Sequence, residues 1–137
     1  MLGDPARCRV VLVTLARELA VDETIEAAFE VEDRAGVVLS EVIVNQYVEP
    51  DAVLDEPLEP DDATKLGPTV SEAVEASRRF ESSRQHAAAA EVARLGDALA
   101  LRQLSLPRLD ADRIGLDETR ALATALLTEI TAIEVTS

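Results

Sequence analysis

Apolar residues along the chain form three short strand-like runs separated by longer stretches with helical spacing. The run Arg9–Leu15 is almost continuously β-branched or aliphatic, which is typical of a strand buried on both faces of a parallel sheet. The run Ser40–Tyr47 has Val42–Val44 at its centre and predicts a second strand of this kind. The third run, Leu99–Leu104, alternates apolar and polar positions and ends before Pro107, a pattern that favours a sheet edge.

Helical spacing predicts three helices between and after these runs. The first covers Val21–Ala35, with Asp22 as a candidate N-cap and Gly36 at the position where a helix C-terminus is expected. The second falls within Ser71–Ala98 and the third covers Asp117–Ile133. A strand, a helix of about four turns and a second strand form a βαβ unit, whose crossover is nearly always right-handed.

The predicted order is β-α-β-loop-α-β-α, in a single α/β domain that spans residues 1–137. This order is half of a doubly wound, Rossmann-like parallel sheet. Residues 49–70 contain four prolines, seven acids and one lysine, so we expect an exposed, acidic and mobile loop there. Two of the three strands look fully interior, so we expect another element to cover the remaining side of the sheet.

The composition excludes several classes of function. A net charge of −14, from 27 acids and 13 bases, disfavours nonspecific binding to nucleic acid or to anionic membranes. The single cysteine excludes an internal disulfide and a cysteine-rich zinc site. Met1–Arg9 has no apolar core of a signal peptide, and no apolar run approaches the roughly 20 residues that span a bilayer. These features predict a soluble, cytoplasmic protein.

Ligands of open parallel sheets bind outside the carboxyl ends of the strands. The loops expected at this rim are 14–19, 45–48 and 106–115. Asn45 stands out because its amide offers both a donor and an acceptor, which matches the edge of a purine base. The alternative is that Asn45 only bonds the backbone of a turn, and that 106–115 is an ordinary strand-to-helix connection.

Four ordered motifs resemble the C-terminal third of the ArsA-type (arsenite-pump, anion-transporting) ATPases, the family that includes the tail-anchored-protein targeting ATPases. The resemblance implies a nucleotide-binding ATPase of the P-loop NTPase class that works as a homodimer or pseudodimer. It also implies that Asn45 contacts adenine, with Gln46 beside it, and that the loop after the Leu-Pro pair packs against the base. The motifs are Val11–Thr24, Val42–Gln46, Arg84–Gln85, and Leu106–Leu109 with Ile114–Leu116; the candidate ATP-binding residues are Asn45, Gln46, Pro107, Arg108, Leu109 and Asp110.

The sequence also departs from this family. The 137 residues contain no Gly-x-x-x-x-Gly-Lys-Ser/Thr loop to cradle phosphates, and they lack the aspartates that bind Mg²⁺ in the family. Position 17 is usually acidic in the family and is Arg17 here. We therefore expect no catalytic or metal-binding residue in this chain, which would be inactive alone.

Two functions remain open from the sequence. In the first, the chain is the C-terminal portion of an ArsA-like ATPase and supplies the adenine side of an ATP site. The phosphates and Mg²⁺ would then be held by a missing N-terminal region or by a paralogous ATPase subunit in a homo- or hetero-dimer. In the second, the chain is a non-catalytic interaction or regulatory module that dimerises with an ATPase partner.

Overall fold

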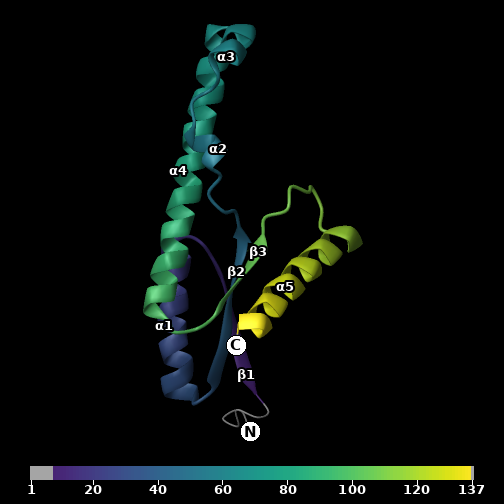
Figure 1. The fold of residues 1–137 in the computed structure, drawn as a ribbon. Helices are drawn as coiled ribbons and strands as arrows, with labels where there is room; N and C mark the ends of the chain where they lie inside the picture. The colour runs from purple at the N-terminus through teal and green to yellow at the C-terminus, as the bar shows by residue number, and fades with distance from the viewer. Residues whose placement is uncertain (1–7, 137) are drawn as a thin grey trace.

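The computed structural model describes residues 8–136, and within them the strands form one parallel three-stranded sheet. The strands are β1 (Arg9–Leu15), β2 (Val38–Tyr47) and β3 (Gln103–Pro107), with β2 in the centre (Figure 1). The expected α/β class with a parallel open sheet is confirmed. The segment on which the signal-peptide prediction depended lies mostly outside the described residues.

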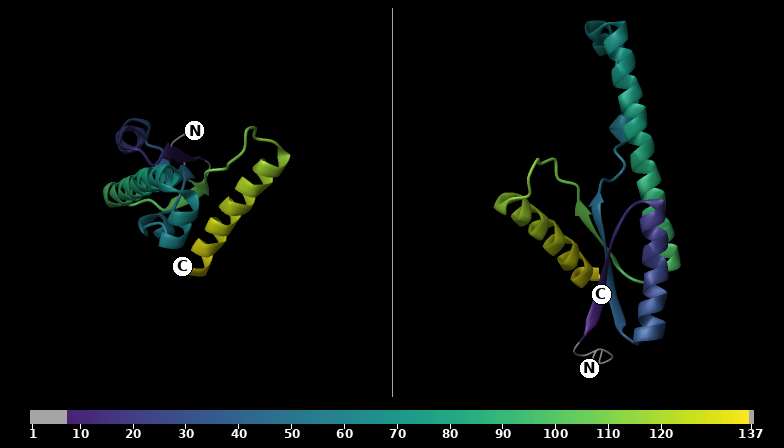
Figure 2. Two further views of the ribbon diagram at one scale, coloured as in Figure 1. Left: turned by 90° about the horizontal axis from the view of Figure 1, so that it is seen from above. Right: turned by 180° about the vertical axis from the view of Figure 1, so that it is seen from behind.

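Helices cover both faces of this sheet. Helices α1 (Glu18–Ala35) and α4 (Pro68–Ala98) lie on one face, and α5 (Leu116–Thr136) lies across the other, against β3 (Figure 2). No helix in the described part of the chain is both long enough and apolar enough to cross a lipid bilayer.

Helix α1 turns one narrow stripe toward the sheet. Val21, Thr24 and Ala28 recur at a spacing of three or four residues and are buried. The helix ends at Gly36, whose φ of 60° is the left-handed conformation that favours glycine, as the sequence predicts. Its N-cap is Arg17 and not Asp22, which instead lies in the second turn and pairs with a side chain of α4.

The core lies between β2 and the layer formed by α1 and α4. Val42 and Val44 on β2 are fully buried, and Leu95 of α4 is 1% exposed between the sheet and α1. Because the chain has almost no aromatic residues, this core is built from valine, leucine and alanine. Packing of Leu95 against these β2 residues also determines the position of α4 along the strands.

Strand β1 is not buried on both faces, which corrects the sequence prediction. It lies at an edge of the sheet, and Val11 and Val13 on its outer face are 46% and 63% exposed. Its other face, with Leu12 and Thr14, packs toward the core. An apolar run predicts a strand, but burial of both faces also requires a second element to cover the strand. Here α5 packs against β3 and leaves the outer face of β1 exposed.

The third strand begins four residues later than predicted. Leu99 is the C-cap of α4 and remains buried in the core, while Leu101 packs against the core from the connection. Both leucines satisfy the alternating pattern without belonging to a strand. Their burial by the core, and not by strand pairing, explains the misplaced boundary.

The predicted loop 49–70 is largely helical, which is a second correction. It contains α2 (Ala52–Asp55), α3 (Pro60–Leu66) and the start of α4. Two of its prolines stand in the first turn of α3 and of α4, where the missing N–H is not needed. Proline therefore marks helix starts in this segment.

The segment around α2 is bonded to one face of α4. The Gln85 side chain accepts from the backbone N–H of Asp51 at 2.9 Å, and Arg78 donates to the carbonyl of Glu56 at 2.8 Å. The segment runs antiparallel to α4, since its successive residues meet progressively earlier residues of the helix. The α4 residues that hold it are Glu75, Arg78, Ser82, Gln85 and His86.

Helix α4 is much longer than the sheet that it covers. Its 31 residues correspond to roughly 46 Å of helix, against about 33 Å for the 10 residues of β2. The N-terminal half of α4 therefore extends past the carboxyl ends of the strands, with α2 and α3 beside it (Figure 1). This overhang places the middle of α4 beside the strand exits.

Candidate functional site

The carboxyl ends of the three strands lie at one edge of the sheet, as the topology predicts. Leu15 pairs with Asn45 in the register of β1 and β2, and Tyr47 pairs with Pro107 in that of β2 and β3. The N–H of Arg108 donates to the carbonyl of Tyr47 at 3.3 Å and continues this pairing past the end of β3. The predicted loops 14–19, 45–48 and 106–115 therefore lie at neighbouring strand ends.

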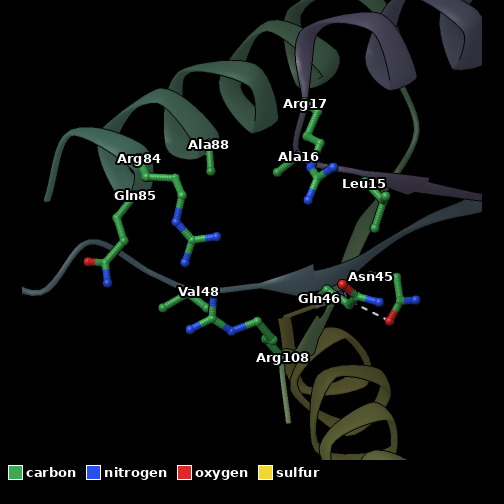
Figure 3. Close-up of a pocket in the computed structure, with 10 residues that line it drawn as sticks. All are labelled: Leu15, Ala16, Arg17, Asn45, Gln46, Val48, Arg84, Gln85, Ala88 and Arg108. Atoms are coloured by element: carbon green, nitrogen blue, oxygen red, sulfur yellow. Dashed lines mark hydrogen bonds between the residues drawn. The ribbon is translucent and has the colours of Figure 1, made fainter. Parts of the chain in front are cut away.

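A hollow of about 210 Å³ opens at this edge, between the strand exits and α4 (Figure 3). Four segments contribute to it: the turn from β1 to α1, the end of β2, the middle of α4, and the residue after β3. Its walls are partly aliphatic and partly polar. They consist of Leu15, Ala16, Arg17, Asn45, Gln46, Val48, Arg84, Gln85, Ala88 and Arg108.

A second hollow, of about 450 Å³, adjoins the first along the outer edge of β1 and the side of α1. The two share Leu15, Asn45 and Gln46, so the end of β2 forms the wall between them. The second hollow has a more aliphatic lining, to which β1 contributes Leu12 and Val13. The first hollow is thus lined by three arginines, and the second, apart from Glu23, by uncharged residues.

The backbone at this wall is strained. Gln46 has φ of 55°, the only positive φ of a non-glycine residue among those described. The Asn45 side-chain oxygen accepts the N–H of Gln46 at 3.0 Å and supports the turn. The sequence-based alternative for Asn45, a turn-bonding role, is therefore present in the structure. The amide nitrogen of Asn45 is not used by this bond and can donate to a ligand.

Gln85 fixes the far wall of the first hollow. Its side chain is buried, accepts the N–H of Asp51, and donates to Glu81 at 3.4 Å. Through these bonds, one α4 residue connects the chain leaving β2 with the helix that faces it. The hollow therefore has a defined width although the segments around it come from distant parts of the sequence.

Three guanidinium groups face the first hollow. Arg84 forms a two-point pair with Glu81, at 2.6 Å and 3.0 Å, and Arg108 lies 4.0 Å from the same carboxylate. The hydrogen bonds from Arg84 are the main cause that lowers the pKa of Glu81. The same bonds raise the pKa of Arg84. Arg17 approaches from the start of α1 on the opposite side (Figure 3).

The six predicted site residues do not all meet in one place. Asn45 and Gln46 line both hollows, and Arg108 lines the first. Pro107 instead lines a third hollow, of about 460 Å³, between the end of β2 and α5. Leu109 lines none of the three. Asp110 is 93% exposed, with its carboxylate 3.8 Å from Arg108.

The prediction missed the contribution of α4 to this site. Arg84 and Gln85 occur in one of the motifs, yet nothing near them in the sequence indicates that they lie beside the strand exits. Their position follows from the length of α4, which carries its middle past the end of the sheet. The only sequence signal for this position was the length of the helical pattern, which exceeds that of the strands.

Comparison with known proteins adds no relative. No protein-family model matches the chain, and no curated protein matches it. The site is therefore interpreted from its own geometry. Among residues 8–136, no group of three or more histidine, cysteine or acidic side chains is arranged to hold a metal ion.

Proposed function

We propose that this chain supplies the base-binding side of a nucleotide site, as the C-terminal portion of an ArsA-like ATPase of the P-loop NTPase class. Phosphates and Mg²⁺ would be held mainly by a segment or subunit outside these 137 residues. ATP hydrolysis would then need the assembled protein, since the chain has neither a phosphate-binding loop nor a metal cluster among its described residues.

The observation that carries this proposal is the position of Asn45. It stands at the carboxyl end of the central strand, between two adjoining hollows, with its amide nitrogen free of the turn bond. Ligands of open parallel sheets bind at this edge. An asparagine amide can pair with the N6 and N7 atoms of adenine, one as donor and one as acceptor.

The volumes of the hollows favour a nucleotide site that is completed by a partner over one formed by this chain alone. Pockets that enclose a whole drug-sized ligand have volumes of about 300–1,000 Å³. The first hollow, at about 210 Å³, holds only part of a nucleotide. The second, at about 450 Å³, has room for a base but is bounded only by β1, the end of β2 and α1. A partner would complete its open side.

The first test separates base recognition from turn support at Asn45. Asn45→Asp keeps the oxygen that accepts the Gln46 N–H but replaces the amide donor with a second oxygen. We expect adenosine to perturb the backbone NMR signals of 45–48 in the native chain. Asn45→Asp should weaken this binding about tenfold, the effect of losing one hydrogen bond to the ligand.

The control is Ser77→Asp, which adds the same negative charge at an exposed position of α4 outside the two hollows. Its affinity for adenosine should equal that of the native chain, and circular dichroism checks that each variant is folded. If Asn45→Asp binds adenosine as tightly as the native chain, Asn45 supports the turn only and the proposed base contact is wrong.

An alternative function, a non-catalytic interaction module, is favoured by a different observation. The outer edge of β1 is unpaired within the described residues, and Val11 and Val13 beside it are exposed. Exposed edge strands with apolar side chains are sites of association. A chain that binds no adenosine but associates through this edge would support the module.

A further inference from the structure

The charge around the first hollow is opposite to that of the whole chain. The chain has a net charge of −14, with 27 acids and only 13 bases. The described residues that line the hollow nevertheless include Arg17, Arg84 and Arg108, and no acid. Because three of the few cations meet in one small space, the hollow should favour an anion.

These arginines converge from three separate elements. Arg17 precedes α1, Arg84 lies in the middle of α4, and Arg108 follows β3 (Figure 3). Glu81 pairs with Arg84 and lies 4.0 Å from Arg108, and the exposed carboxylate of Asp110 lies 3.8 Å from Arg108. These two carboxylates offset at most two of the three positive charges. Among residues 8–136, no carboxylate lies within ion-pair distance of the Arg17 guanidinium. The hollow therefore keeps a positive surplus.

The N-terminus of α1 adds to this surplus. Arg17 is the N-cap, and no side chain caps the N–H groups of the first turn. The carboxylate of Glu18 is also in this turn but does not line the hollow. The N-terminus of an 18-residue helix carries a partial positive charge that favours anions. The helix end acts together with the arginines here and is not a site by itself.

The chemistry of the lining identifies the class of anion. A guanidinium group presents planar pairs of N–H donors that match two oxygens of a phosphate. Three such groups on different sides can reach more oxygens than one carboxylate offers. The volume of about 210 Å³ suits a single phosphate-sized group and not a whole nucleotide.

We propose that this hollow binds a phosphate group, either as a free inorganic anion or as part of a phosphorylated ligand, through Arg17, Arg84 and Arg108. The inference deepens the proposed function, because Asn45 and Gln46 separate this hollow from the one suited to a base. It also differs from the sequence-based expectation that every phosphate contact lies outside this chain. Arg17 provides the sharpest test, since no carboxylate among residues 8–136 lies within ion-pair distance of it.

The experiment measures binding of pyrophosphate, inorganic phosphate, adenosine and ADP to the full chain by NMR titration in a chloride buffer. We expect pyrophosphate to bind with millimolar affinity and to perturb the backbone signals of residues 15–17 and 108. Arg17→Ala should weaken binding about tenfold, and Arg17→Glu should abolish it, because each removes a charged hydrogen-bond donor.

The matched control is Arg34→Ala, which removes an exposed arginine at the other end of the same helix. Its affinity for pyrophosphate should equal that of the native chain. Arg108→Ala provides a second variant whose effect should match that of Arg17→Ala. Equal losses for Arg34→Ala and Arg17→Ala would show nonspecific attraction and overturn the proposal, as would the absence of any pyrophosphate binding to the folded native chain.

The four ligands separate this inference from the proposed function. Pyrophosphate binding without adenosine binding supports the arginine site and contradicts the base contact. Adenosine binding without pyrophosphate binding does the reverse. Tighter binding of ADP than of either part supports both and identifies the source of the phosphate as a nucleotide, whereas equal binding of ADP and pyrophosphate indicates a free anion.

Discussion

At the scale of single residues, Leu95 shows how few side chains hold this fold. It is 1% exposed in a core whose fully buried members include no aromatic side chain, although Tyr47 packs against it. It directly follows Arg94, which pairs with Asp22 at 2.7 Å and donates to the carbonyl of Glu18 at 3.2 Å. These adjacent residues join α4 to α1, one through apolar contact and the other through polar contact.

Truncating Leu95 should therefore be costly. We expect Leu95→Ala to lower the free energy of unfolding by about 2–5 kcal/mol, through lost burial and the cavity left behind. Urea unfolding followed by circular dichroism measures the change. Leu127→Ala on α5 is the matched control, since Leu127 is 63% exposed and should change stability by less than about 0.5 kcal/mol. Equal effects of the two would mean that Leu95 is not in the core.

At the scale of elements, the docking of α2 on α4 depends on ionised groups. The carboxylate of Asp55 accepts hydrogen bonds from Ser82 and His86, and these lower its pKa below the ordinary value of 3.8. A pKa that is lower in the folded chain gives stability that is present above pH 3.8 and is lost as the pH falls through the folded value. The contribution is small because Asp55 is exposed to solvent.

This dependence can be measured as a difference between two proteins. We expect Asp55→Asn to have a lower Tm than the native chain at pH 6, and the difference to shrink as the pH falls below about 3.8. Thermal unfolding over this pH series provides the comparison. Asp112→Asn, in the exposed connection before α5, should show no such pH-dependent difference. A Tm difference for Asp55→Asn that stays constant would contradict the assigned role of its charge.

The elements also show what the sequence could specify. The apolar runs predicted the βαβ unit, and Gly36 marked the end of α1, because these signals are local. The boundary of β3 could not be read, since Leu99 and Leu101 are buried by the core and not by strand pairing. The helices of 49–70 were missed because proline was interpreted as a breaker, although it begins two of them.

The candidate site was predictable in part for the same reason. Parallel strands bring Asn45 and the residues after β3 to one edge, so topology alone placed them near each other. The position of Arg84 beside the strand ends depends on where α4 crosses the sheet, and packing around Leu95 determines that crossing point. No sequence pattern near Arg84 indicates which part of α4 lies beside the strand ends.

At the scale of the whole molecule, the two edges of the sheet differ. Helix α5 packs against β3, while the outer side of β1 has exposed valines and no paired strand among the described residues. Natural edge strands are commonly protected by charged residues, and β1 has Arg9 at its start but none between Val10 and Leu15. This side of the sheet is the part of the fold most suited to contact with another chain.

We expect the native chain to associate at high concentration through β1, and Val13→Lys to shift it toward monomer by placing a charge on that edge. Light scattering over a concentration series measures the mass. Val53→Lys is the matched control, because Val53 is also highly exposed, at 60%, but lies on α2. A native chain that remains monomeric at every concentration would contradict this role for β1.

The overhang of α4 affects how such masses must be measured. A helix that continues well beyond the body that supports it increases the frictional drag of a 14.7 kDa chain, compared with a sphere of the same mass. Gel filtration calibrated with spherical standards would consequently return an inflated molecular weight even for a lone copy. Early elution would reflect this elongated outline, and only a method independent of shape can reveal a genuine pair.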